Sequence, residues 1–297
     1  NTLTDITVNL TVSGANSFSD SFVIGSLNPN TTQTIVFDAF TPAVTGDNVV
    51  TVTVEDDENN ANNSRSVNQK VTSDTYSYAE EGYTSGSVTS NGLTLSRFSV
   101  TGIRMITGVN IRISNDLNSV GNTVYAVVTD RWGSIIGQSA DLTISPADLG
   151  KMYYFTIGNP PLINNDEFLA GLACTSPVGV TYYPVSIQNE IPVRMNTYYT
   201  SGIGGGYLNT YNNRFITEAV ASEPSLNVSD NSLTIDQPAN STGTFDITSN
   251  MTWNVSSSQA WLTTSEFNGS WDATITLTAE ENATGSDRFA TVTVYGA

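Results

Sequence analysis

The sequence predicts an all-β protein made of three consecutive β-sandwich modules. One stretch shows strict alternation, with Val109, Ile111 and Ile113 on one side and polar residues on the other, which is typical of a half-buried strand. Two apolar runs, 124–128 and 134–138, flank a turn that contains Asp and Gly, and this order predicts an antiparallel hairpin. The same order of strand, polar turn and strand continues along the chain, and no stretch reads as a long amphipathic helix.

The composition fits this fold class and excludes several partners. Hydrophobic residues make up 38% of the 297 residues, so cores can form, while only 13% are charged. The chain is long enough for two or three domains. A net charge of −18, from 28 acidic and 10 basic residues, excludes nucleic acid as a partner, because nucleic acid binding needs clustered Lys and Arg.

The residue types also argue against catalysis. The sequence has no histidine, and its one cysteine, Cys174, lies in an apolar run that predicts a buried, inert thiol. Nucleophilic triads and an internal disulfide are therefore excluded, and no phosphate-binding glycine motif is present. The adjacent carboxylates Glu80-Glu81 and Asp166-Glu167 are interpreted as solvated surface, although a glycosidase would need such a pair. We predict that this chain is not an enzyme.

The first residues already alternate like a strand, and no apolar run is long enough to span a membrane. We expect the chain to be part of a longer, exported polypeptide.

Residues 1–73 form the first predicted module. Alternating strands begin at Ile6 and end near Val54, and a further strand is expected to carry Ile35 and Phe37. The step SLNPNTTQTIVF, the strand G-x-x-x-V-T-V and the turn D-x-x-N-x-x-N-N resemble the cell-adhesion-related Ig-like domain abbreviated CARDB. The resemblance implies an Ig-like sandwich.

The acidic turn of this module is a candidate calcium site. Hard oxygen ligands cluster in it, and Ca²⁺ prefers such ligands. The candidate metal ligands are Asp56, Asp57, Glu58 and Asn60. The spacing is not that of an EF-hand, and an Asx-rich turn that bonds its own backbone is the alternative interpretation. Calcium is the one cofactor that the sequence suggests.

Residues 74–222 form the second predicted module, a jelly-roll-like sandwich with eight strands. The strands are expected at Leu93–Val100, Val109–Ser114, Thr123–Asp130, Ser134–Ser139, Met152–Ile157, Glu167–Cys174, Thr181–Ile187 and Phe215–Val220. The pattern G-N-x-V-Y-x-x-V-x-D, followed by Gly, resembles jelly-roll modules of long secreted surface proteins of Bacteroidetes.

Residues 223–297 form the third predicted module. Trp253, Trp261-Leu262, Gly269, Asn282 and Arg288 occur, before a final strand, in the order found in the BACON family. That resemblance implies a small Ig-like sandwich in a secreted protein. It also implies carbohydrate binding or a spacer role that holds other domains away from the cell.

Exposed aromatic rings among amides are the composition expected of a glycan site. Trp132 lies at the predicted hairpin tip next to Arg131. A second stretch is rich in tyrosine, glycine and asparagine, a composition of recognition loops. The candidate ligand-binding residues are Trp132, Tyr198, Tyr199, Tyr207 and Tyr211. Packing on a sandwich edge is the alternative for the tyrosines. For Trp253 and Trp261 the core interpretation is favoured.

These observations predict a non-catalytic segment of a large bacterial protein that is secreted or exposed on the exterior of the outer membrane. It would serve as an adhesion, carbohydrate-binding or spacer region, with a glycan or a surface protein as partner. The alternative is an accessory region of a secreted peptidase or polysaccharide-degrading enzyme whose catalytic domain lies elsewhere.

Overall fold

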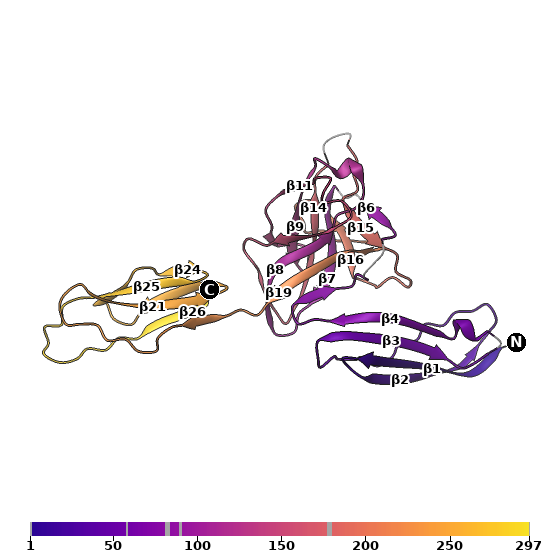
Figure 1. Ribbon diagram of the computed structural model, residues 1–297, viewed down its shortest axis with the longest axis horizontal. Helices are drawn as coiled ribbons and strands as arrows, with labels where there is room; N and C mark the ends of the chain where they lie inside the picture. The colour runs from indigo at the N-terminus through magenta and orange to yellow at the C-terminus, as the bar shows by residue number, and fades with distance from the viewer. Residues whose placement is uncertain (1, 58, 81–83, 89–90, 177–179, 297) are drawn as a thin grey trace. The chain divides into compact units, whose positions relative to one another are not determined.

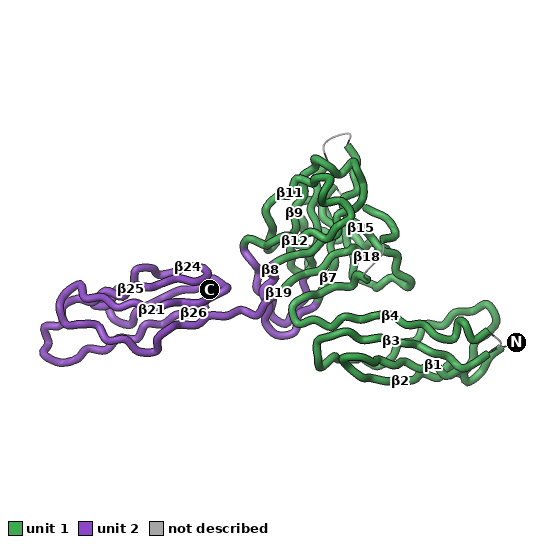
Figure 2. The backbone as a smooth tube through the Cα atoms, in the orientation of Figure 1, with its two compact units in different colours: residues 1–98, 108–158, 169–221 green, residues 99–107, 159–168, 222–297 purple. Residues whose placement is uncertain are grey.

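The computed structural model confirms the all-β fold class (Figure 1). It describes residues 2–57, 59–80, 84–88, 91–176 and 180–296. Within these ranges the helices are two short 3₁₀ turns, η1 (Asn60–Asn62) and η2 (Leu117–Ser119). None of the described residues belongs to a helix long and apolar enough to cross a membrane. The chain forms two compact units, one made of residues 1–98, 108–158 and 169–221 and the other of 99–107, 159–168 and 222–297 (Figure 2). The module boundaries after residues 73 and 222 remain predictions.

The N-terminal strands form one antiparallel sheet in the order β2-β1-β3-β4. Its strands are β1 (Leu3–Gly14), β2 (Phe18–Leu27), β3 (Gly46–Val54) and β4 (Ser64–Val71). Alternation places the apolar side chains of these strands on one face, where Val8, Val12 and Ile24 are buried. The expected strand through Ile35 and Phe37 is wrong, since residues 28–45 belong to no strand. The physical reason is that no strand among the described residues exchanges backbone–backbone hydrogen bonds with this segment.

A buried amide fixes the way this segment returns to the sheet. The side-chain oxygen of Asn16 accepts hydrogen bonds from the backbone of Ala43 and Val44, each at 3.0 Å. Its side-chain nitrogen donates to the Val44 carbonyl at 2.8 Å. Asn16 thus replaces a missing strand partner at the point where the chain enters β3.

Residues 75–222 contain three further antiparallel sheets. Their orders are β10-β9-β14-β7-β16-β17 with β11 paired to β9, β12-β8-β19-β5 with β13 paired to β8, and β18-β15-β6. Their strands are β5 (Thr75–Ser77), β6 (Gly86–Val88), β7 (Gly92–Ser99), β8 (Ile103–Arg112), β9 (Thr123–Asp130), β10 (Ile135–Gln138), β11 (Leu142–Thr143), β12 (Met152–Thr156), β13 (Leu162–Asn164), β14 (Glu167–Cys174), β15 (Val185–Gln188), β16 (Tyr198–Ser201), β17 (Asn209–Thr210), β18 (Arg214–Phe215) and β19 (Thr217–Ser222).

The central strands β7 and β14 are buried on both faces. On one face, Phe98 contacts Tyr76 of the neighbouring sheet, with 6.3 Å between ring centroids. On the other face, Leu93, Leu95, Leu169 and Tyr199 belong to one cluster of buried residues, against which Leu208 packs. The segment after β16 therefore covers an apolar face of the largest sheet.

The C-terminal strands form two sheets, β20-β21-β25-β23 and β24-β22-β26. Their strands are β20 (Leu226–Val228), β21 (Ser241–Ser249), β22 (Thr252–Ser257), β23 (Leu262–Thr264), β24 (Asn268–Ser270), β25 (Ala273–Ala279) and β26 (Val292–Gly296). Side chains from both sheets share one core, in which Trp253 and Val255 of β22 meet Ile275 and Leu277 of β25. This is a two-layer sandwich.

Candidate ligand-binding surface

The turn between β9 and β10 holds Trp132 away from the protein. The carboxylate of Asp130 accepts hydrogen bonds from the backbone of Trp132 at 3.0 Å and Ser134 at 2.8 Å. Gly133 has a φ of 93°, a conformation that glycine adopts without strain. The Trp132 side chain is 61% exposed. The hairpin tip is therefore a fixed turn that presents a large ring to solvent, as predicted.

The glycine-rich loop between β16 and β17 is bonded to the same hairpin. The backbone N–H of Gly206 donates to the Gly133 carbonyl at 2.8 Å. A Cβ atom at Gly205 would come within 2.2 Å of the same carbonyl oxygen, so only glycine allows this approach. Leu208 anchors the loop in the buried cluster, while Tyr207 beside it is 74% exposed. The two most exposed rings predicted as ligand contacts thus lie on loops that are joined by their backbones.

Two arginines lie at or near the hairpin tip. The Arg131 guanidinium stands 4.2 Å from the centroid of the Trp132 ring. Arg97 lies over the buried Tyr199 ring at 4.9 Å and donates to the Arg131 carbonyl at 3.3 Å. In a chain with only 10 basic residues, two of them support this one surface. The surface combines flat apolar rings with guanidinium donors.

The other predicted tyrosines pack in the protein. Tyr198 and Tyr199 in β16 are only 1% and 6% exposed, so their assignment as ligand contacts is corrected: they are core residues. The sequence pattern did not reveal their burial, because β16 is buried on both faces and shows no alternation of apolar and polar residues. Tyr211 is half-buried and stacks on Phe215, with 5.1 Å between ring centroids. Burial raises the pKa of Tyr198, against the opposing effect of Arg194 and Arg214.

The candidate calcium ligands lie in the loop after β3. Asp56 is exposed. Asp57 accepts a hydrogen bond from the backbone of Asn59 at 2.7 Å, and Asn60 accepts one from the backbone of Asp57 at 3.0 Å. Glu58 lies outside the described residues. This bonding is that of an Asx-rich turn. Among the described residues, no group of three or more acidic, histidine or cysteine side chains could hold a metal ion. Calcium binding remains a prediction.

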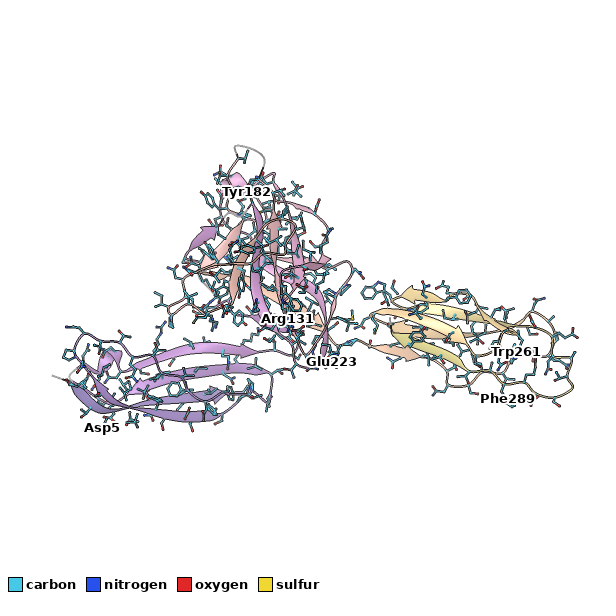
Figure 3. All side chains as sticks on the ribbon, turned by 180° about the vertical axis from the view of Figure 1, so that it is seen from behind. Asp5, Arg131, Tyr182, Glu223, Trp261 and Phe289 are labelled. Carbon is cyan, nitrogen blue, oxygen red and sulfur yellow. The ribbon has the colours of Figure 1, made fainter. Side chains whose placement is uncertain are left out.

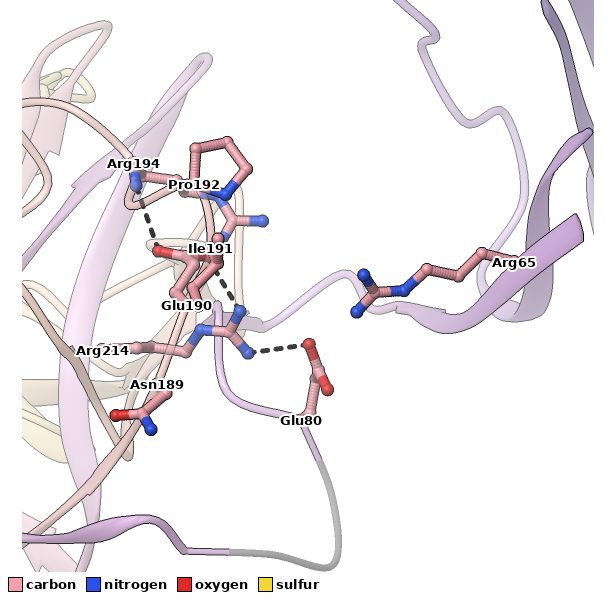
Figure 4. Close-up of a pocket in the computed structure, with 8 residues that line it drawn as sticks. All are labelled: Arg65, Glu80, Asn189, Glu190, Ile191, Pro192, Arg194 and Arg214. Atoms are coloured by element: carbon pink, nitrogen blue, oxygen red, sulfur yellow. Dashed lines mark hydrogen bonds and ion pairs between the residues drawn. The ribbon is translucent and has the colours of Figure 1, made fainter. Parts of the chain in front are cut away.

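A second polar site surrounds Arg214 (Figure 4), and sequence reasoning missed it. The Arg214 guanidinium donates to Glu190 at 2.8 Å and to Glu80 at 3.1 Å. Glu190 also pairs with Arg194. These residues line much of a polar pocket of about 270 Å³. Arg65 lines the same pocket, so three guanidinium groups and two carboxylates face it. The charged side chains of its lining thus sum to +1.

The acidic residues considered above as a glycosidase pair bind different partners. The Asp166 carboxylate accepts a hydrogen bond from the backbone of Glu167 at 2.8 Å. The Glu80 carboxylate is held by Arg214, and Glu81 lies outside the described residues.

The tryptophans of the C-terminal sandwich differ in their roles. Trp253 is 1% exposed and donates through its indole nitrogen to the Trp271 carbonyl at 2.8 Å. The Arg288 guanidinium covers the Trp261 ring at 4.3 Å, near Phe289 at the same end of the sandwich (Figure 3). Trp271, between β24 and β25, is 49% exposed, and its φ of 65° breaks the strand alternation there. The core interpretation holds for Trp253.

The comparison with protein families gives a match in the C-terminal part of the chain. Residues 225–297 match the family described as the viral BACON domain, which confirms the BACON resemblance of this segment. The CARDB resemblance and a Bacteroidetes source remain predictions. No curated protein matches the sequence.

One similar solved structure is the clostridial cysteine protease Cwp84 after propeptide cleavage, at 12% identity and a TM-score of 0.38. The match covers 72% of the present chain and 65% of the protease chain, less than two thirds of its length. A likeness of this size supports no conclusion about activity.

Proposed function

We propose that this chain is a non-catalytic binding region that recognises glycans through Trp132 and Tyr207. The observation that carries the proposal is the hydrogen bond between Gly206 and Gly133, which fixes two loops that each present an exposed ring. Sugar rings stack on flat aromatic faces, and loops already held in place lose little entropy when a ligand binds. The BACON match supports a carbohydrate-associated role, since that family is named for a presumed role of this kind.

We further propose that the region acts outside a cell or on a virus particle. In either place it could contact the glycans of a cell surface. The description of the matched family as viral supports the second location. The ion pairs that Arg214 makes with Glu80 and Glu190 support a structural rather than catalytic use of these carboxylates.

The test is a glycan-array screen of the full chain, with and without Ca²⁺, followed by calorimetry on the strongest glycan. We expect Trp132→Ala and Tyr207→Ala each to weaken binding about tenfold or more, equivalent to about 1.4 kcal/mol for a lost stacking contact. Tyr295→Ala is the matched control, because Tyr295 is 50% exposed on β26 and should leave affinity unchanged.

A screen without any bound glycan would contradict the proposal, as would a glycan whose affinity neither variant changes. Dependence of binding on Ca²⁺ would independently support the calcium prediction for the Asp56–Asn60 loop.

A further inference from the structure

The segment between β2 and β3 resembles a strand that has no neighbour. Ile35 and Phe37 are half-buried, while Val36 between them is 82% exposed. Phe40 stacks on Phe18 of β2, with 5.3 Å between ring centroids. The segment therefore packs alternate side chains toward the N-terminal sheet, as an additional strand would.

The middle of this segment, residues 32–37, has no backbone hydrogen-bond partner among the described residues. Thr31 donates to Asn28 at 3.2 Å, and Asp38 donates to the Asp20 carboxylate at 2.8 Å. Between them, the backbone N–H and C=O groups of residues 32–37 make no hydrogen bond with any described residue. Such a row of unpaired groups is a template for another strand.

The apolar face under the segment is only partly covered. Val8 pairs in register with Phe22 and Val54, so these side chains share the face that contains the buried Val8. Phe22 and Val54 are nevertheless 36% and 37% exposed, and Val67 on the same face is 43% exposed. Apolar area thus remains for a second layer that one segment does not fill.

We propose that residues 33–37 pair with the same residues of a second copy and form an antiparallel dimer. Residues 21–37 contain no charged side chain, although the chain carries −18, so two copies can approach here without local charge repulsion. The hexapeptide TQTIVF is free of proline and glycine and rich in β-branched residues, which favours pairing with itself.

The alternation also fixes the register of this pairing. Antiparallel partners share a face only when inward residues oppose inward residues. A two-fold axis through Ile35 satisfies this condition, because it places Gln33 opposite Phe37. Both copies then keep Ile35 and Phe37 on their own sheets, and Thr34 of each copy exchanges backbone hydrogen bonds with Val36 of the other.

The test is sedimentation equilibrium of the full chain with Val36→Pro and Val36→Thr. The proline removes an N–H that makes no internal bond, and its side chain replaces one that is exposed, so the monomer should keep its circular dichroism and melting temperature. Threonine is the matched control, since it is β-branched and keeps the N–H. We expect a reversible dimer for the wild type and for Val36→Thr, and a dissociation constant raised at least about tenfold for Val36→Pro.

Hydrogen exchange of the wild type provides a second measurement, which does not depend on the folding of a variant. Protection of the amides of Thr34 and Val36 should rise as the protein concentration rises. A monomer at every concentration, a dimer that Val36→Pro leaves intact, or protection that does not depend on concentration would each overturn the proposal. Pairing only with a strand of a different protein would appear as the first of these results.

Discussion

Replacing Arg214 with methionine should destabilise the chain more than any exposed charge replacement. The Arg214 side chain is 5% exposed, and its partner Glu190 is 7% exposed. The guanidinium makes bonds to Glu190, to Glu80 and, at 3.3 Å, to the side-chain oxygen of Gln188. Methionine fills a similar volume but leaves Glu190 with Arg194 as its remaining charged partner.

The expected cost is about 3–5 kcal/mol, the range for removing one partner of a buried ion pair. Most of it comes from Glu190, whose carboxylate stays buried. Glu80 is 50% exposed and can turn to water, so loss of its bond should add under about 1 kcal/mol. For a cooperative unit of roughly 150 residues the total corresponds to a fall in melting temperature of about 6–20 °C.

The assay is calorimetric unfolding of the full chain, with Glu80→Gln as the exposed counterpart and the double variant Arg214→Met/Glu190→Met to close a cycle. The double variant should be more stable than Arg214→Met alone, because it leaves no carboxylate of Glu190 to bury. Equal effects of Arg214→Met and Glu80→Gln, or a cost for Arg214→Met under about 1 kcal/mol, would refute the reasoning.

Three further predictions test the packing described above. Gly171→Ala should cost at least about 2 kcal/mol in urea unfolding, because its Cβ would lie 1.7 Å from the Thr94 carbonyl oxygen, whereas Gly158→Ala, with nothing within 4 Å, should be neutral. Trp253→Ala should destabilise the C-terminal sandwich by about 3–5 kcal/mol, and an unchanged unfolding midpoint would exclude Trp253 from its core. Burial raises the pKa of Tyr182 to about 12, so this phenol should ionise late in an absorbance titration and Tyr182→Phe should remove one late step. Because the folded pKa lies above the ordinary value, the stabilising contribution of the neutral phenol should hold below about pH 10 and disappear as the pH rises toward 12.

Strands with a strong local pattern could be predicted from the sequence. The alternating and continuous apolar runs at Thr123–Asp130 and Glu167–Cys174 are β9 and β14 with the predicted bounds. The short strand β16 was missed, because its neighbours in the sequence are polar and glycine-rich. It is a strand because β7, far away in the sequence, supplies its partner backbone. Residues 31–37 show the reverse case, in which alternation is present but no strand of the described residues pairs with it.

The sequence could predict single exposed residues of the candidate site, but not which loops lie together in it. Hairpin chemistry around Asp130 and Gly133 indicated that Trp132 would be exposed. Local patterns could not show that the Tyr207 loop is bonded to that hairpin, because the contact joins segments from different regions of the chain. The pairing of Glu80 with Arg214, 134 residues later, is likewise set by tertiary packing.

The hydrogen bond between Gly206 and Gly133 has a consequence for evolution, because the glycines around it and the aromatic rings beside them are under different constraints. A Cβ atom at Gly205 would meet the Gly133 carbonyl oxygen, and Gly133 has a φ of 93° that other residues rarely adopt, so selection should hold both positions fixed whatever the protein binds. The adjoining positions, Trp132 and Tyr207, extend into solvent and contribute little to the core. Mutations there can change the preferred ligand without the loss of stability that usually accompanies a new specificity. Related proteins should therefore share the glycines and diversify the rings.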